Sequence, residues 1–129
     1  MRELKLRVWD SEKMLYPRAP RYIAIGGCSW GFWDEEKLLA GNHNPNHKLM
    51  QYTNYADRNL VEIYENDIVD IIFPKKLFNR GIVCFEKGSW MIKWDYGRKG
   101  GRLSFLGEVH ENIEKSGNIY ENPELLEMS

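Results

Sequence analysis

The stretch Glu62–Ile72, EIYENDIVDII, decides the fold that the sequence predicts. Asn66 and Asp67 interrupt its strand pattern, and such side chains bond their own backbone and tolerate left-handed conformations, so they favour a turn. The residues after the turn are almost continuously apolar, which is typical of a strand buried on both faces. The stretch therefore predicts a strand, a turn and a central strand.

The letters IYEN return near the end of the chain, in NIYENPELLE, Asn118–Glu127. Asn122 is a good helix cap, and Pro123 suits the first helical position, so a short C-terminal helix is expected. The similarity goes no further, because DIVDII does not resemble PELLEM. We interpret the echo as shared turn chemistry and not as an internal repeat.

The start of the chain predicts a β-hairpin over residues 1–16. In ELKLRVWD, Leu4, Leu6 and Val8 alternate with polar residues or Trp9, as in a half-buried strand, and DSEK then forms a turn before MLY. Further short strands are expected in KLMQYT, RGIVCFE, SWMIKWDY and GRLSFLGEV. Their spacing is typical of a small antiparallel barrel or sandwich. We expect a mainly β fold with little α: the N-terminal hairpin, a small antiparallel SH3-like barrel over 49–122, and the short C-terminal helix.

Residues 21–42 are expected to form one strand and a short helix. RYIAIGGCSWGFW predicts a strand followed by a connection rich in Gly and Trp, and DEEKLLAGN predicts one or two helical turns, capped by Asp34 and closed by Gly41. The residues expected in the core are those on the apolar faces of the strands: Leu4, Leu6, Val8, Ile68, Val69, Ile71, Ile82, Val83 and Ile92.

Length and composition predict one soluble intracellular domain, residues 1–129. Apolar residues make up 43% of the chain and the net charge is −1, with no apolar run of membrane-spanning length and no signal peptide. Residues 74–102 carry eight Lys or Arg against two acids, whereas residues 103–129 carry six Glu against one Lys. These opposite charges could meet within the fold or between subunits, and we expect a homo-oligomer in which the N-terminal hairpin reaches a neighbouring subunit.

No motif predicts catalysis, a metal site or a cofactor. Cys28 and Cys84 lie in apolar contexts and are expected to be reduced core cysteines. His43 and His47 flank Pro45 without a third ligand, and His110 has no nucleophile motif around it. We therefore expect a protein that is not an enzyme.

The basic and aromatic segment 75–102 has some features of a nucleic-acid-binding surface. Basic groups beside aromatic residues on a small barrel suit single-stranded nucleic acid, although aromatics at a period of two are first of all a core signal. The residues that would form this surface are Lys75, Lys76, Arg80, Trp94, Arg98, Lys99 and Arg102.

Three segments resemble the YopX family, small proteins typical of bacteriophages and prophages. They are MRELKLRVWDSEKMLY at the start, LMQYTNYADRNLVEIYENDIV at Leu49–Val69 and GNIYENPELLE at Gly117–Glu127. The family usually has Gly where this chain has Leu60 and Asn66. Asn replaces Gly in a left-handed turn at small cost, but Leu does not, so the turn at Leu60 is expected to differ in shape.

The resemblance implies a fold and a setting, and no chemistry. It implies a mainly β protein with a small barrel-like body, located in the cytoplasm of an infected or lysogenic bacterium. The family's shared residues look structural, and no established activity comes with it. The expected function is a self-associating interaction protein that engages a host or phage protein, with a nucleic-acid-binding module as the alternative.

Overall fold

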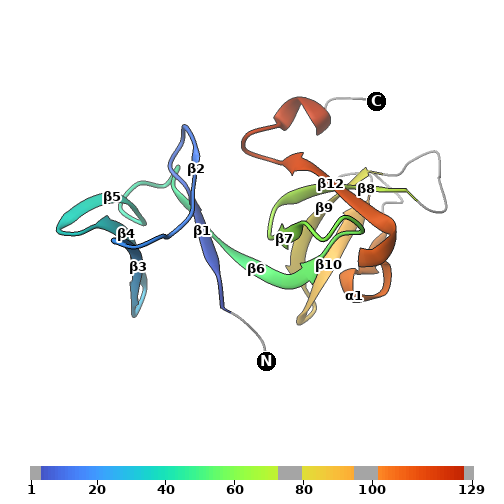
Figure 1. The fold of residues 1–129 in the computed structure, drawn as a ribbon, viewed down its shortest axis with the longest axis horizontal. Helices are drawn as coiled ribbons and strands as arrows, with labels where there is room; N and C mark the ends of the chain where they lie inside the picture. The colour runs from blue at the N-terminus through green and yellow to red at the C-terminus, as the bar shows by residue number, and fades with distance from the viewer. Residues whose placement is uncertain (1–3, 73–79, 95–101, 127–129) are drawn as a thin grey trace. The chain divides into compact units, whose positions relative to one another are not determined.

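A computed structural model describes residues 4–72, 80–94 and 102–126 (Figure 1). The chain divides into two compact units, Leu4–Gln51 and, within the described residues, those from Tyr52 onward. The helices of the described part span at most four residues each, whereas about 20 are needed to cross a bilayer.

The N-terminal unit begins with the predicted hairpin. β1, Leu6–Trp9, pairs with β2, Met14–Leu15, and the Asp10 side chain accepts the N–H groups of Glu12 and Lys13 in the turn between them. β1 also pairs with the first half of β6, Lys48–Ala56. The hairpin is therefore built into this unit and is not a free arm.

The rest of the N-terminal unit is a three-stranded antiparallel sheet. Its order is β3, Arg21–Gly26; β4, Ser29–Asp34; and β5, Lys37–Gly41. The expected helix over DEEKLLAGN is therefore wrong: Asp34 ends β4, and Glu35 at φ 56° opens a tight turn into β5. The Gly- and Trp-rich connection is likewise a strand, because Gly27 at φ 57° turns the chain back on itself.

One apolar cluster holds the N-terminal unit together. The buried side chains come from the hairpin and from the three-stranded sheet: Val8, Leu15, Phe32 and Ala40, with Ile23, Trp30, Leu39 and Leu49 packed against them. Phe32 lies between Ile23 and Ala40 in the sheet register, so all three share the cluster face. Tertiary packing of Ala40 on this face overrides the helical tendency of its short segment.

The C-terminal unit is a curled antiparallel sheet of five strands, which corresponds to the predicted small barrel. The sheet order is β11-β10-β9-β8-β12. The strands are β8, Asp67–Ile71; β9, Arg80–Glu86; β10, Ser89–Trp94; β11, Leu103–Phe105; and β12, Ile113–Asn118. β7, Glu62–Tyr64, pairs with the second half of β6.

Short helical segments complete this unit. α1, Leu106–Val109, and the 3-10 turn η2, His110–Asn112, link β11 to β12, where a continuous strand was expected through GRLSFLGEV. The predicted C-terminal helix is present as the 3-10 helix η3, Pro123–Leu126. The prediction of a mainly β fold with little helix is confirmed.

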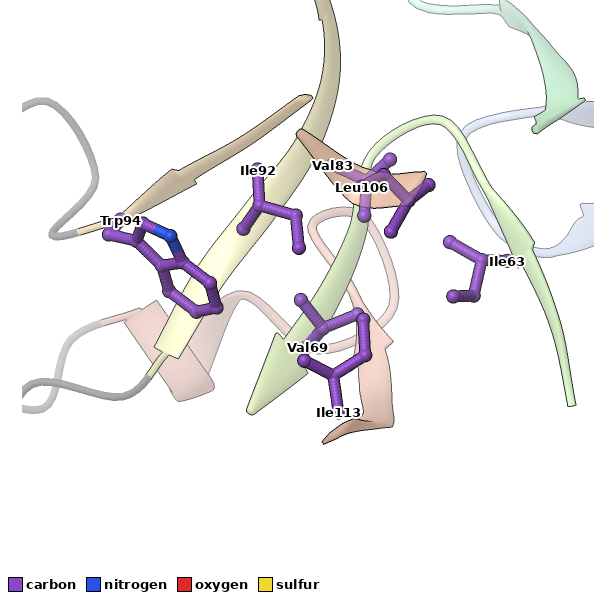
Figure 2. Packing of buried hydrophobic residues seen from close by; sticks show 7 residues of the cluster. All are labelled: Ile63, Val69, Val83, Ile92, Trp94, Leu106 and Ile113. Atoms are coloured by element: carbon purple, nitrogen blue, oxygen red, sulfur yellow. The ribbon is translucent and has the colours of Figure 1, made fainter. Parts of the chain in front are cut away.

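The core of the C-terminal unit consists of seven buried residues (Figure 2): Ile63, Val69, Val83, Ile92, Trp94, Leu106 and Ile113. Of the residues expected in the core, Val8, Ile68, Val69, Val83 and Ile92 are buried, and Leu6, Ile71 and Ile82 are half-buried. The prediction for Leu4 is wrong: it precedes β1 and is 74% exposed. Conversely Arg7, which was expected on the polar face of β1, is fully buried.

Candidate functional site

The two IYEN turns lie side by side at one end of β8 and β12. Asp67 stands opposite Asn118 in the register of these strands. The N–H of Ile119 donates to the carbonyl of Asn66 at 3.1 Å, and the Asn66 side-chain amide donates to the Tyr120 hydroxyl at 3.3 Å. Sequence reasoning identified both turns correctly and missed that they are in contact.

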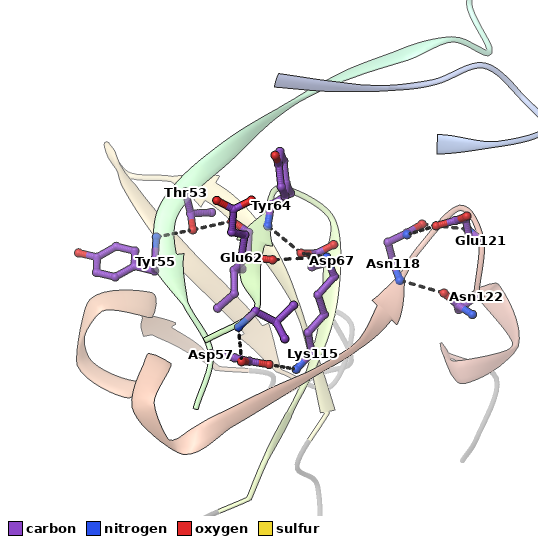
Figure 3. Close-up of polar contacts among 12 residues, drawn as sticks. Thr53, Tyr55, Asp57, Glu62, Tyr64, Asp67, Lys115, Asn118, Glu121 and Asn122 are labelled. Carbon is purple, nitrogen blue, oxygen red and sulfur yellow. Dashed lines mark hydrogen bonds and ion pairs between the residues drawn. The ribbon is translucent and has the colours of Figure 1, made fainter. Parts of the chain in front are cut away.

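Asn118 organises the second turn. Its Oδ1 accepts the N–H groups of Tyr120 at 3.1 Å and Glu121 at 2.9 Å, and its Nδ2 donates to the Glu121 carboxylate at 2.7 Å. The Asn118 N–H donates to Oδ1 of Asn122 at 3.2 Å (Figure 3). A Cβ on Gly117 would lie 2.3 Å from that same Asn122 oxygen, so the motif GNIYEN needs Gly at its first position.

Asp57 organises a third turn, in the segment NYADRNLV. Its Oδ1 accepts the N–H groups of Asn59 at 2.8 Å and Val61 at 3.0 Å, and its Oδ2 accepts the N–H of Lys115 at 2.8 Å (Figure 3). The turn holds Leu60 at φ 65°. Leu60 thus adopts the left-handed conformation that it disfavours, and the Asp57 carboxylate stabilises the turn by accepting two N–H groups within it and one from β12.

A buried ion pair connects the first turn to β12. The Lys115 ammonium lies 3.1 Å from Oδ2 of Asp67, whose side chain is fully buried, and the same oxygen accepts the N–H of Tyr64 at 2.7 Å. The ammonium also lies 5.8 Å from the centroid of the Tyr64 ring. The lysine therefore pairs its charge with the buried Asp67 carboxylate, donates to the carbonyl of Glu62 at 3.4 Å and packs on the Tyr64 ring.

A second ion pair includes Arg80, which was predicted to contact nucleic acid. Its guanidinium forms two hydrogen bonds to Asp70, at 2.7 and 3.0 Å, and donates to the carbonyl of Leu125 at 3.1 Å. Asp70 also accepts the Ser116 hydroxyl at 2.6 Å. Arg80 thus ties β9 to β8 and to η3.

The other predicted nucleic-acid residues fall into three groups. Trp94 is buried in the core, and its indole N–H donates to the Ser104 hydroxyl at 2.8 Å, so its ring is not exposed for stacking on a base. Arg102 is exposed. Lys75, Lys76, Arg98 and Lys99 lie outside the described residues. Nucleic-acid binding stays a prediction.

The histidines form no metal site with their described neighbours. His43 and His47 have ring centroids 5.8 Å apart in an edge-on arrangement, and Nδ1 of His47 accepts the N–H of Gly41 at 3.2 Å. In the described parts of the chain, no three His, Cys, Asp or Glu residues gather as metal ligands. His110 packs on Tyr55 and hydrogen-bonds the carbonyl of Ala56.

The two cysteines differ in environment. Burial raises the pKa of the Cys84 thiol above its ordinary value, and the negative charge of Glu86 adds to this effect. Cys28 is exposed in the turn after β3, so its assignment to the core is wrong. Gly26 and Gly27 leave this turn without side chains that could cover the thiol.

The fold and the turn network define a class: a two-unit, mainly β protein whose polar motif residues build contacts between turns and strands. The chain belongs to the YopX family, whose model, described as YopX protein, matches residues 5–127. Two of the three segments that carried the resemblance contain residues of this network: Asp57 and Asp67 lie in Leu49–Val69, and Asn118 lies in Gly117–Glu127.

Two solved structures resemble this fold. The crystal structure of protein yopX from Bacillus subtilis matches with a TM-score of 0.75 and 26% sequence identity, over 97% of this chain and 97% of that one. A protein from Enterococcus faecalis matches with a TM-score of 0.59 and 22% identity, over 98% and 99% of the two chains. A comparison with curated proteins found no match.

Proposed function

We propose that this protein is a non-enzymatic, self-associating interaction protein of a phage or prophage that works in the cytoplasm of the bacterial host. It would bind a second copy of itself and, as an assembly, engage a host or phage protein. Membership of the YopX family supports the phage setting that the resemblance implies.

The observation that carries the proposal is the exposure of β3. Five of its six residues are exposed, including Tyr22 at 47% and Ile25 at 60%. β3 is an outer strand of its sheet, and within the described part of the chain no strand pairs with its free edge. A long exposed edge that carries apolar side chains is a template for pairing with another chain.

The hydrogen bonds and ion pairs of three aspartates support a non-enzymatic role. Both oxygens of Asp57 accept backbone N–H groups, Asp67 is paired with Lys115, and Asp70 is paired with Arg80. A general base needs a lone pair directed at substrate, whereas these carboxylates already hold the backbone and other side chains. Their contacts serve the turns and strands of the C-terminal unit.

The hairpin is a poorer candidate for the contact between subunits than β3. Val8 and Leu15 are buried in the cluster of the N-terminal unit, so deleting residues 1–16 would remove part of that core. A mass change after such a deletion would not separate loss of an interface from loss of the fold. Substitution at the exposed edge separates the two.

The alternative, a nucleic-acid-binding module on segment 75–102, predicts a strong salt dependence of binding. Each phosphate contact releases counterions, so affinity for a single strand would fall steeply with salt. Of the described residues assigned to it, Trp94 is buried and Arg80 is paired with Asp70. The burial of Trp94 and the ion pair of Arg80 favour the interaction protein over this alternative.

Light scattering coupled to gel filtration tests the proposal. We expect a mass above the 15.3 kDa of one chain at micromolar concentration, falling toward it on dilution. The matched variants are Ile25→Lys on β3 and Leu60→Lys in the C-terminal unit, since both replace exposed apolar residues. Ile25→Lys should lower the mass and Leu60→Lys should not. A mass of one chain at every concentration would contradict the proposal.

A further inference from the structure

We infer that two copies of this chain pair through the free edges of their β3 strands, antiparallel, with Ala24 on the twofold axis. This inference rests on the proposed self-association and specifies its geometry. The result would be one continuous six-stranded sheet across the dimer, formed from the β3-β4-β5 sheets of the two N-terminal units.

From Tyr22 to Gly26, the β3 edge lacks the devices that normally prevent edge-to-edge pairing. Such edges are usually protected by charges, prolines or bulges. Between Tyr22 and Gly26 the sequence has no charged residue and no proline. The register with β4 is unbroken from Arg21 opposite Asp34 to Gly26 opposite Ser29, so β3 has no bulge.

The turn after β3 determines which backbone groups face the free edge. Gly27 and Cys28 form a two-residue hairpin loop, with the positive φ of 57° at Gly27, as in a type II′ turn. Such a loop is closed by a hydrogen-bonded pair, here Gly26 and Ser29, and bonded pairs then alternate along the strands. Tyr22 and Ala24 therefore bond to β4, whereas Ile23 and Ile25 direct their N–H and C=O groups outward.

Symmetry then restricts the register. A twofold axis perpendicular to the sheet keeps each residue on the same face in both copies, so residues directly opposite each other must share a face. The axis must therefore lie midway between the two copies of one residue, so that this residue is opposite itself; we call this an axis through that residue. An axis through Ala24 pairs all of Tyr22–Gly26, whereas an axis through Ile23 would place Arg21 opposite Ile25.

The side chains fit this register. Ile25 shares a face with Ile23, which packs on the core cluster, yet Ile25 is 60% exposed. In the dimer it would lie opposite Ile23 of the partner subunit, which extends the apolar face across the axis. On the other face Tyr22 would lie opposite Gly26 of the partner subunit, and a Cβ on Gly26 has nothing within 4 Å, so the ring has room.

Disulfide cross-linking tests the register. In a Cys28→Ser background, Ala24→Cys would place two thiols opposite each other in a non-hydrogen-bonded pair, with Cα atoms about 4.5 Å apart, which suits a disulfide. The matched control is Tyr22→Cys, also exposed on β3, whose two copies would lie four residues apart, about 13 Å. Diamide, which takes up the two electrons and two protons, serves as oxidant.

We expect a disulfide-linked dimer from Ala24→Cys and none from Tyr22→Cys or from the background protein, with circular dichroism showing that all three are folded. Cross-linking of both variants alike, or of neither, while light scattering still shows an assembly, would overturn this register and leave self-association standing. A protein that stays monomeric in light scattering would overturn both proposals.

Discussion

At the scale of the residue, the family motifs are explained by carboxylates and amides that satisfy backbone groups. Asp57, Asp67 and Asn118 each accept at least one N–H within their own turn. A buried N–H without a partner costs free energy comparable to a lost hydrogen bond, so each side chain stabilises a turn that the backbone alone would not hold.

Asp67→Ala should destabilise the C-terminal unit strongly. The substitution leaves the Lys115 ammonium without its buried partner, and breaking a buried pair costs roughly 3–5 kcal/mol. The matched control is Glu86→Ala, because Glu86 and Lys93 lie at the same distance of 3.1 Å but are 37% and 42% exposed. The control should cost less than about 1 kcal/mol. Equal losses in urea titrations would contradict the role given to Asp67.

Leu60→Gly should leave stability unchanged or raise it by up to about 1 kcal/mol, since Gly removes the strain of a left-handed Leu but adds freedom to the unfolded chain. Leu60 is 84% exposed, so little packing is lost. Urea denaturation measures the difference. A clear loss of stability would show that the Leu60 side chain makes a contact that its exposure does not reveal.

Cys28 should react with iodoacetamide in the folded protein well before Cys84. The thiolate is the reactive form, and burial raises the pKa of Cys84, so less thiolate is present at neutral pH. The labelling rate of Cys84 should rise with pH and should still be rising at the ordinary thiol value of 9.0, because the pKa of Cys84 lies above it. Mass spectrometry of labelled peptides measures both rates, and faster labelling of Cys84 at pH 7 would contradict this account.

At the scale of the element, the strands that the sequence predicts well are those with a clear pattern. The alternation around Val8 and the apolar run of β8 identified their strands and the buried residues Val8, Ile68 and Val69, but not the burial of Arg7. β5 was missed because Lys37–Gly41 is too short for periodicity to separate helix from strand. Its strand character comes from pairing with β4, which no local pattern records.

The turn network of the C-terminal unit was also predictable only in part: the turns were, but their partners were not. Asn66 and Asn122 were assigned to turns from their side-chain chemistry alone. The bond from the Lys115 N–H to Asp57 joins residues 58 positions apart, and the pair of Asp67 and Lys115 joins residues 48 apart. Single-sequence patterns carry no signal for such distant partners, so the network could only be seen in the fold.

Gly117→Ala should destabilise the turn after β12, because its Cβ would overlap Oδ1 and Cγ of Asn122. Overpacking of this kind costs about 1–3 kcal/mol. The cost should be smaller in an Asn122→Ala background, where those two atoms are absent. A double-mutant cycle in urea measures the coupling, and additive effects would contradict direct contact between the two positions.

At the scale of the whole molecule, the two units have separate apolar cores and different surfaces. The C-terminal unit contains the turn network in which Asp67 and Asn118 take part, and the N-terminal unit carries the exposed edge of β3. We therefore assign the stabilising turn network to the C-terminal unit and association between copies to the N-terminal unit. Substitutions in β3 should change assembly without changing the core around Ile92.

Amide hydrogen exchange along β3, followed by NMR at two protein concentrations, tests the central claim most directly. The N–H groups of Tyr22 and Ala24 bond to β4 and should be protected at both concentrations, which provides the internal control. Those of Ile23 and Ile25 face the free edge and should gain protection only at the higher concentration, where β3 pairs with its copy. Equally fast exchange of Ile23 and Ile25 at both concentrations would contradict association through β3.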